Sequence, residues 1–311
     1  MQDTIFSTAD LADLLSVSSA TVKRWADTDR IRCFKTPGGH RKFRLSDIAH
    51  FLERTGYRAT GVLAAILNDA RANRTVEEAV IRRDLAAVVP AFERRALRGD
   101  VAGLGCILSA LSANGVRLSE AFDVVMTPAF RSIGERWKAG ELSVVDEHVA
   151  TNAAIDALGR VRGRIEPSPG EVRTAMCACL PGEHHELGIR AVAVILERHG
   201  FRATTSGADT PLEALEARLR LRPTTLLALS TRRPPEDAGT IVAIQRLATS
   251  ARRSGTTLVL GGSGFAAAPE EIRRLAPVYG TCAPFAEALR VGLLDNRNGH
   301  ADNGRHDEEG A

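Results

Sequence analysis

The stretch from Val172 to Gly188, VRTAMCACLPGEHHELG, decides the fold of the C-terminal part of this 311-residue chain. It begins as a short apolar run typical of a buried strand and passes through a Pro-Gly turn to polar residues, just before a helix begins near Leu187. A strand, a turn and a helix form the repeating unit of parallel α/β sheets, in which ligands bind beyond the carboxyl ends of the strands. The segment therefore predicts a sheet with a ligand site at its edge.

The same unit recurs toward the C-terminus. Short strand-like runs cover residues 201–205, 224–229 and 257–260, and helical stretches begin near Pro211, Asp237 and Pro269. We therefore expect a flavodoxin-like, doubly wound parallel sheet over residues 171–295, with helices on both faces. Cys177 and Cys179 share one face of the first strand, where buried packing is favoured over a redox pair.

A helical region precedes the sheet. Between residues 61 and 166 the pattern is helical, and breaks at 99–100, 114–115 and 138–140 divide it into four helices. Helices with such short connections pack against each other, which predicts a four-helix bundle over 61–166. The Pro- and Gly-rich stretch 167–170 is predicted to be a linker.

Three notable side chains are expected at one end of the bundle. Ser143 and Asp146 have capping-box spacing, which places Glu147 and His148 in or near the first turn of the last helix. Trp137 lies at the end of the preceding helix, so a tight loop would bring it together with Glu147 and His148, facing the sheet. A tryptophan in a helical core beside a solvated Glu-His pair is the alternative interpretation.

Residues 1–58 have the pattern of a winged helix-turn-helix. Residues 11–15 mark a short amphipathic helix, and the serine-containing turn at 17–19 can cap a second helix that places Trp25 in the core. A third helix begins at Leu45. The chain is therefore expected to be a multidomain α and α/β protein.

The predicted wing concentrates positive charge. Residues 31–34 and 41–44 alternate as hairpin strands around a Pro-Gly-Gly turn at 37–39, and the stretch from Arg30 to Arg44 contains no acidic residue. Such a stretch can dock on DNA phosphates or be a solvated face, and the helix pair before it favours DNA. The candidate DNA-binding residues are Thr21, Lys23 and Arg24 on the second helix and Lys35, His40, Arg41 and Lys42 on the wing.

Composition narrows the class of protein. The net charge of +3 is too small to identify a partner, and five scattered cysteines without zinc-type spacing fit a reduced compartment. We expect no secretory leader, because the N-terminal residues do not have the basic-then-apolar pattern of one, and no apolar run approaches the roughly 18 residues of a membrane span. We expect a soluble cytoplasmic protein with no membrane partner, and a disordered tail at the polar residues 296–311.

The wing sequence carries a family resemblance. The turn Gly38-Gly39-His40-Arg41-Lys42-Phe43 resembles the wing of MerR-superfamily winged helices of the excisionase-like or BldC-like kind, over residues 7–54. The resemblance implies double-stranded DNA as the partner of this domain.

The C-terminal motifs resemble the cobalamin-binding domain of corrinoid proteins, whose order is Asp-x-His-x-x-Gly, then Ser-x-Leu, then Gly-Gly. The matching residues are Glu183, His185, Gly188, Ser230, Gly261 and Gly262. The resemblance implies that His185 is the lower axial cobalt ligand, with Glu183 bonded to its other ring nitrogen. It also implies that Gly188 allows close approach of the ligand, that Ser230 contacts the displaced dimethylbenzimidazole tail, and that Gly261 and Gly262 leave space for it.

The order of all three parts resembles the CarH/LitR group of light-responsive transcription factors. This resemblance implies a non-enzymatic, homo-oligomeric regulator with adenosylcobalamin or methylcobalamin, and it places Trp137, Glu147 and His148 at the upper face of the cofactor. The chain departs from the families in Glu183 for Asp, in Arg232 for a small apolar residue, and in Lys138 for a His. A corrinoid methyl-carrier protein, and a regulator whose pocket binds another tetrapyrrole or no corrinoid, remain the alternatives.

Overall fold

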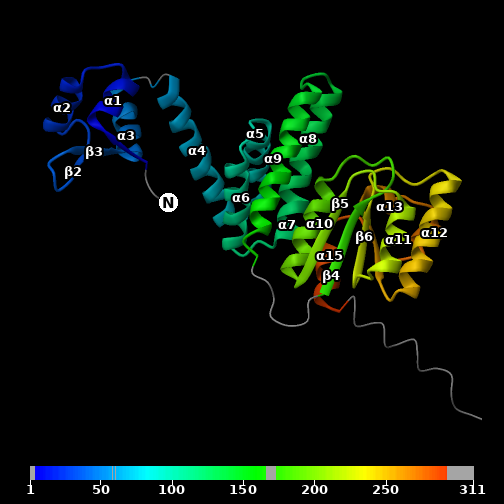
Figure 1. Cartoon of the computed structure of the whole chain (residues 1–311). Helices are drawn as coiled ribbons and strands as arrows, with labels where there is room; N and C mark the ends of the chain where they lie inside the picture. The colour runs from blue at the N-terminus through cyan, green and yellow to red at the C-terminus, as the bar shows by residue number, and fades with distance from the viewer. Residues whose placement is uncertain (1–3, 58, 60, 166–172, 293–311) are drawn as a thin grey trace, which may run out of the picture. The chain divides into compact units, whose positions relative to one another are not determined.

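A computed structural model describes residues 4–57, 59, 61–165 and 173–292 (Figure 1). The chain divides into two compact units, Met1–Glu78 and Ala79–Ala311. The predicted linker at 167–170 and the predicted tail at 296–311 lie outside the described residues. Within the described part, no helix is both long and apolar enough to cross a membrane.

The first unit contains a winged helix-turn-helix. Its helices are α1 (Thr8–Leu15), α2 (Ser19–Asp27) and α3 (Leu45–Thr55), and α4 (Gly61–Ile81) follows them. Its strands β1 (Ile5–Ser7), β2 (Phe34–Lys35) and β3 (Arg41–Arg44) pair antiparallel in the order β1-β3-β2. Ser18 accepts the Thr21 N–H and caps α2, as the sequence predicts.

The core of this unit forms around Trp25, which is 6% exposed and lies 4.9 Å from the ring of Phe51, centroid to centroid. The prediction that a wing strand covers residues 31–34 is wrong, because β2 begins only at Phe34. The Ile31 N–H is bonded instead to the Trp25 carbonyl at the end of α2, and its side chain is buried. The alternation of apolar and basic residues over 31–34 therefore covers two features, the turn that follows α2 and the first residue of β2.

The second unit begins with a helical bundle. Its helices are α5 (Leu85–Leu97), α6 (Val101–Ala113), α7 (Leu118–Ala121), the π-helix η1 (Phe122–Met126), α8 (Thr127–Lys138) and α9 (Val144–Arg162). The three predicted breaks are confirmed. A further break at 82–84, where Arg83 adopts a positive φ of 57° and Asp84 caps α5, was not predicted. The helical region from residue 61 is therefore cut once more than expected, and α5 begins at Leu85.

A parallel sheet forms the rest of the second unit. Its described strands are β4 (Arg173–Cys179), β5 (Phe201–Gly207), β6 (Leu226–Ser230), β7 (Thr257–Gly261) and β8 (Val278–Tyr279), in the order β5-β4-β6-β7-β8. The helices are α10 (Leu187–Arg198), α11 (Leu212–Leu221), α12 (Ala238–Arg253), α13 (Ser263–Ala266), α14 (Glu270–Arg273) and α15 (Cys282–Arg290). This order is that of a flavodoxin-like, doubly wound sheet, which confirms the predicted fold class.

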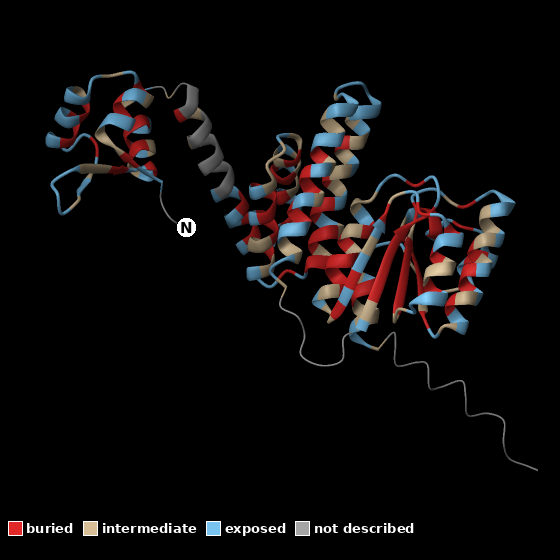
Figure 2. Cartoon of the chain, in the orientation of Figure 1, coloured by how far each residue is buried: buried red, intermediate tan, exposed pale blue. Residues whose placement is uncertain are grey.

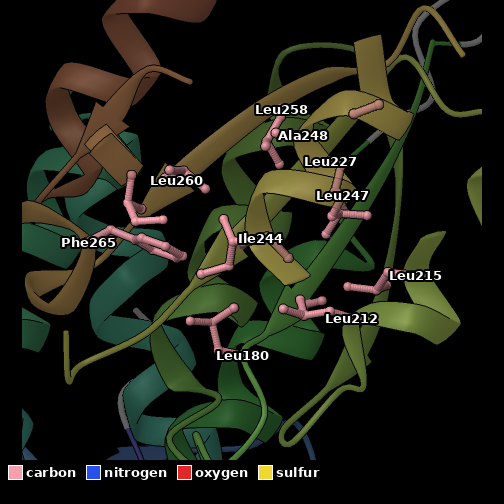
Figure 3. Close-up of a cluster of buried hydrophobic side chains, with 14 of the residues drawn as sticks. Leu180, Leu212, Leu215, Leu227, Ile244, Leu247, Ala248, Leu258, Leu260 and Phe265 are labelled. Carbon is pink, nitrogen blue, oxygen red and sulfur yellow. The ribbon is translucent and has the colours of Figure 1, made fainter. Parts of the chain in front are cut away.

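The two faces of β4 pack against different helices. Met176, Ala178 and Leu180 belong to the cluster that α11 and α12 complete with Leu212, Leu215 and Ile244 (Figure 3). Cys177 and Cys179 alternate with those residues and are fully buried, and burial raises the pKa of both thiols to about 12. The cysteines are therefore packing residues, and the central strands β4, β6 and β7 are mostly buried (Figure 2).

Among the described residues, hydrogen bonds and ion pairs join the bundle to α15 and to α10 beside the sheet, and one of them is the pair of Arg117 with Glu287 at 3.5 Å. Both carboxylate oxygens of Asp123, in η1, accept N–H groups at the start of α15, from Cys282 at 2.8 Å and from Ala283 at 2.7 Å. At the end of α9, Arg162 forms an ion pair with Glu197 of α10 at 2.5 Å. An acceptor that caps a helix from another element ties the two together, because the first N–H groups of a helix lack partners within it.

Candidate functional site

The loop that carries His185 lies at the point where the strand order of the sheet reverses. It follows β4, and the chain leaves β4 for β5 on one side and returns to β6 on the other. Loops on the two sides of this switch diverge and leave a crevice beyond the carboxyl ends of the strands, which is where open α/β sheets bind ligands. Ser230 ends β6 and Gly261 ends β7, so three of the predicted motifs meet at this edge.

Within the loop, Glu183 holds His185 by two hydrogen bonds. Its Oε1 lies 2.6 Å from Nδ1 of the His185 ring and accepts the backbone N–H of His185 at 2.8 Å. The Glu183 side chain is 6% exposed, whereas that of His185 is 56% exposed. Because an ionised carboxylate only accepts hydrogen bonds, Nδ1 is the donor, and in the neutral imidazole Nε2 then has a lone pair that can bind a metal.

The other oxygen of Glu183 is bonded to the loop after β6. Its Oε2 accepts the backbone N–H of Arg232 at 2.6 Å. Burial alone would raise the pKa of Glu183, but the N–H groups of Arg232 and His185 and the His185 ring outweigh it and lower the pKa below its ordinary value of 4.5. The carboxylate therefore stays ionised at neutral pH and fixes the orientation of the imidazole across the switch point.

The glycines of the site have different surroundings. A side chain at Gly188, in the first turn of α10, would meet nothing within 4 Å outside that helix, which leaves room for a ligand to approach. At Gly262, whose φ is +89°, a Cβ would come within 2.5 Å of the Thr231 carbonyl. Gly262 is thus required by the close approach of the chain's own β6 loop.

Trp137, Glu147 and His148 lie at the turn between α8 and α9, as predicted. The capping box of Ser143 and Asp146 is present at the start of α9. Trp137 is 45% exposed and the His148 side chain 67% exposed, and neither is packed in a core. The alternative of a core tryptophan is therefore wrong, while the expectation that the three residues face the sheet stays a prediction.

The candidate DNA-binding residues occupy α2 and the wing. Lys23, Arg24, Lys35 and His40 are exposed, and Thr21, Arg41 and Lys42 are half-buried. Arg41 donates a hydrogen bond of 2.5 Å to Asp27, at the end of α2, and so joins the wing to the second helix. This ion pair gives Arg41 a structural task beside any phosphate contact.

Sequence reasoning identified the histidine and its carboxylate but missed the backbone groups that hold them. The N–H of Arg232 is 49 residues from Glu183 in the sequence. Thr231 and Gly262 lie on the loops after two different strands. No local spacing in the sequence encodes either contact. Arg232 stands where the family has a small apolar residue, but this difference does not affect the hydrogen bond to Glu183, because the donor is the backbone N–H of Arg232.

Three domain families match the chain. Residues 5–56 match a helix-turn-helix domain, residues 74–162 a B12 binding domain, and residues 173–291 a second B12 binding domain family. The chain therefore combines a helix-turn-helix domain with B12-binding domains, which confirms the predicted domain types.

Two curated relatives come from Myxococcus xanthus. The HTH-type transcriptional repressor CarH is 37% identical over 106 residues, which are 33% of this chain and 34% of that repressor. The HTH-type transcriptional repressor CarA is 34% identical over 122 residues, 39% of this chain and 40% of that repressor. The chain thus matches less than half the length of each relative, and the similarity supports the predicted CarH-like resemblance.

A solved corrinoid protein has a fold similar to that of a large part of this chain. The monomethylamine corrinoid protein of Methanosarcina barkeri aligns with a TM-score of 0.50 at 17% identity, over 66% of this chain and 97% of that protein. At this identity the likeness concerns the fold alone.

Proposed function

We propose that this protein is a DNA-binding transcriptional regulator controlled by a bound cobalamin. The observation that carries the proposal is the hydrogen-bonded series from Arg232 N–H through Glu183 to His185, which presents one oriented imidazole at the ligand-binding edge of the sheet. When bound, the corrinoid would supply a cobalt centre, and His185 would hold it through the ring nitrogen that is not bonded to Glu183. The donor type and the open space at Gly188 fit that group.

The remaining cofactor residues are assigned by the same proposal. Ser230, Gly261 and Gly262 would border the nucleotide tail, although the β6 loop already occupies the space beside Gly262. Trp137, Glu147 and His148 would cover the upper face, and their exposure leaves them accessible to a large flat ligand. The binding experiment described below determines whether the cofactor carries an adenosyl or a methyl group.

The first unit would supply the output. An exposed α2 with Lys23 and Arg24, next to a wing with Lys35 and His40, matches the way a recognition helix and a wing engage the major groove and the adjacent phosphates. We propose double-stranded DNA as the partner, a homo-oligomer as the binding form, no catalytic activity, and action in the cytoplasm.

A corrinoid methyl-carrier protein is the second candidate, because the fold of the second unit is shared with a corrinoid protein. The helix-turn-helix domain at residues 5–56 favours the regulator, since a carrier has no use for it. Gel-shift titration of duplex DNA with cobalamin-free and cobalamin-loaded protein separates the two candidates. A regulator changes its DNA affinity between the two forms, whereas a carrier binds DNA equally weakly in both.

The absorption spectrum tests the cofactor itself. Protein mixed with adenosylcobalamin or methylcobalamin is expected to give the spectrum of a histidine-ligated corrinoid, and His185→Ala is expected to lose it. His184→Ala is the matched control, because the structure gives His184 no bond to Glu183 in the described loop. An unchanged spectrum in His185→Ala would remove the proposed ligand, and retention of haem or a bilin would favour a divergent pocket.

A light response is a further part of the proposal, and Lys138 limits it. A protonated lysine has no lone pair for cobalt, so the residue after Trp137 offers no second imidazole in this chain. Illumination of the adenosylcobalamin-loaded protein should therefore give no long-lived product in which cobalt has two histidine ligands, one of them at position 138. Lys138→His is expected to create one, and a wild-type spectrum of that kind surviving in His148→Ala would contradict the assignment of the upper face.

A further inference from the structure

The loop after β5 contacts the histidine loop from the side opposite to Arg232. Asp209, between β5 and α11, accepts the Gly182 N–H on its Oδ1 at 2.7 Å. Its own backbone N–H donates to the carbonyl of Glu183 at 2.9 Å. One residue therefore bonds the chain on both sides of the peptide that leads into Glu183.

The neighbouring residue continues this connection. Thr210 is 8% exposed, and its N–H donates to the carbonyl of Cys179 at 3.3 Å, at the end of β4. The loops after β4 and β5 are thus joined at Cys179, Gly182 and Glu183. The loop after β6 holds the Glu183 side chain through Arg232, so the carboxylate that orients His185 is supported from both sides of the switch point.

Asp209 adopts a backbone conformation that most side chains avoid. Its φ is 45°, in the left-handed region, which aspartate tolerates better than other residues with a Cβ. The residue is exposed, so burial of its side chain does not account for this conformation. The two bonds to the histidine loop do account for it, because this conformation directs the carboxylate and the backbone N–H toward the same loop.

We propose that Asp209 is a positioning residue for the cobalt ligand. By fixing the backbone at Gly182 and Glu183, it holds the Glu183 carboxylate where it can accept from both Arg232 and the His185 ring. This inference rests on the proposed function for the identity of the metal, but the hold on the loop is a property of the protein without cofactor.

Three substitutions separate the acceptor from the backbone conformation. Asp209→Asn keeps an acceptor oxygen and tolerates a positive φ, Asp209→Gly keeps the backbone conformation without an acceptor, and Asp209→Ala loses both. Asp237→Ala is the matched control, because Asp237 is also exposed and accepts the Thr240 N–H at 2.7 Å to cap α12. It should lower stability without moving the histidine.

Two readouts decide the inference. In cofactor-free protein, hydrogen exchange at the Gly182 amide should speed up in Asp209→Gly by about 2- to 10-fold, the equivalent of one lost hydrogen bond, and remain as in wild type in Asp209→Asn and Asp237→Ala. With cobinamide, which has no nucleotide base of its own, the histidine-ligated fraction should fall in Asp209→Gly, fall further in Asp209→Ala, and be restored in Asp209→Asn.

Unchanged exchange and unchanged histidine ligation in Asp209→Gly would overturn the inference. So would an equal loss of ligation in Asp237→Ala, since the effect would then follow from stability alone. If wild type binds neither cobinamide nor cobalamin, the proposed function fails, and the exchange measurement still decides whether Asp209 holds the loop.

Discussion

The two predicted faces of the cofactor site differ in how firmly the protein holds them. The loop with His185 is bonded to its neighbours on both sides, through Arg232 and through Asp209, and its carboxylate is buried. The α8–α9 turn with Trp137 and His148 is exposed, and the described bonds that join the bundle to the sheet lie elsewhere, at Asp123, Arg162 and Arg117. The face with His185 is therefore ordered by the protein's own hydrogen bonds, whereas the predicted face at the α8–α9 turn is exposed.

This difference has a physical meaning for a sensor. A ligand bound by a preorganised group loses less free energy to ordering the protein, which favours retention of the cofactor. The α8–α9 turn is bonded within the bundle, by the capping box and by Arg136, but its surface is exposed. An exposed surface can change its contacts with a ligand without breaking the core beneath it. We therefore expect substitutions in the histidine loop to affect retention, and substitutions at the α8–α9 turn to affect the response.

The largest effect is expected on the preorganised face. Glu183→Gln should weaken corrinoid binding by roughly 10- to 100-fold, because an amide is a weaker acceptor and can present its NH2 group to the wrong donors. The contribution of the ionised carboxylate to stability is present above the ordinary pKa of 4.5 and is lost as the pH falls through the lowered pKa of Glu183. Titration of binding in wild type and Glu183→Gln measures the change, and equal affinities would show that Glu183 does not orient the ligand.

The next effect concerns the joint between bundle and sheet. Asp123→Ala should lower the free energy of unfolding of the second unit by about 1–2 kcal/mol, because α15 loses the acceptors for two N–H groups. Asp123→Asn keeps one oxygen and should lose less. Urea unfolding followed by circular dichroism measures both variants. A loss at Asp123 as small as that at an exposed residue would mean that the bundle is not tied there.

The wing also contains a residue with a structural partner, Arg41, beside one for which only a DNA contact is proposed, Lys42. Lys42→Ala should reduce the slope of log affinity for DNA against log salt by about 0.9 for one lost phosphate contact. Arg41→Ala should also lower the stability of the first unit, because Arg41 is paired with Asp27. Gel shifts across a salt series and thermal unfolding separate these effects. A variant that combines Arg41→Ala with Lys42→Ala and keeps the wild-type salt slope would rule out the wing as a phosphate contact.

The smallest effect on stability is expected on the open face. Trp137→Ala should change the free energy of unfolding by less than about 1 kcal/mol, because the side chain is 45% exposed and surface substitutions cost little. Its effect should appear instead in the difference between the cofactor-loaded and cofactor-free protein in DNA binding. A loss of several kcal/mol on unfolding would show that Trp137 is a core residue and that the contrast between the two faces is mistaken.

Local patterns predicted the parts of the fold that local chemistry determines. The caps at Ser18 and Ser143 and the strand before His185 follow from residue spacing and hydrophobic period, and each is present. In the first unit, β1 was missed and the predicted strand at 31–34 was wrong. In the parallel sheet, the predicted strands begin and end within two residues of those observed, except that β8, with two residues, was missed. So short a strand carries no period of its own, and its pairing with β7 supplies its conformation.

The candidate site was predictable only in part, for the same reason. The spacing of Glu183 and His185 is local, and the structure confirms that these side chains meet. The support from Arg232 and Asp209, and the cap that Asp123 gives α15, join segments that are far apart in sequence. Their residue types also match ordinary surface positions, so no sequence signal distinguishes them from solvated charges.

The central claim is that His185 is the cobalt ligand that Glu183 orients, and electron paramagnetic resonance tests it most directly. Protein labelled with nitrogen-15 only at histidine is loaded with cob(II)alamin, and the splitting of the cobalt lines by the axial nitrogen is recorded. The account predicts that the triplet of an ordinary nitrogen becomes a doublet in wild type and in His184→Ala, and that the doublet is absent in His185→Ala. A triplet that persists in the labelled wild type would show that the cofactor keeps its own base and would contradict the account.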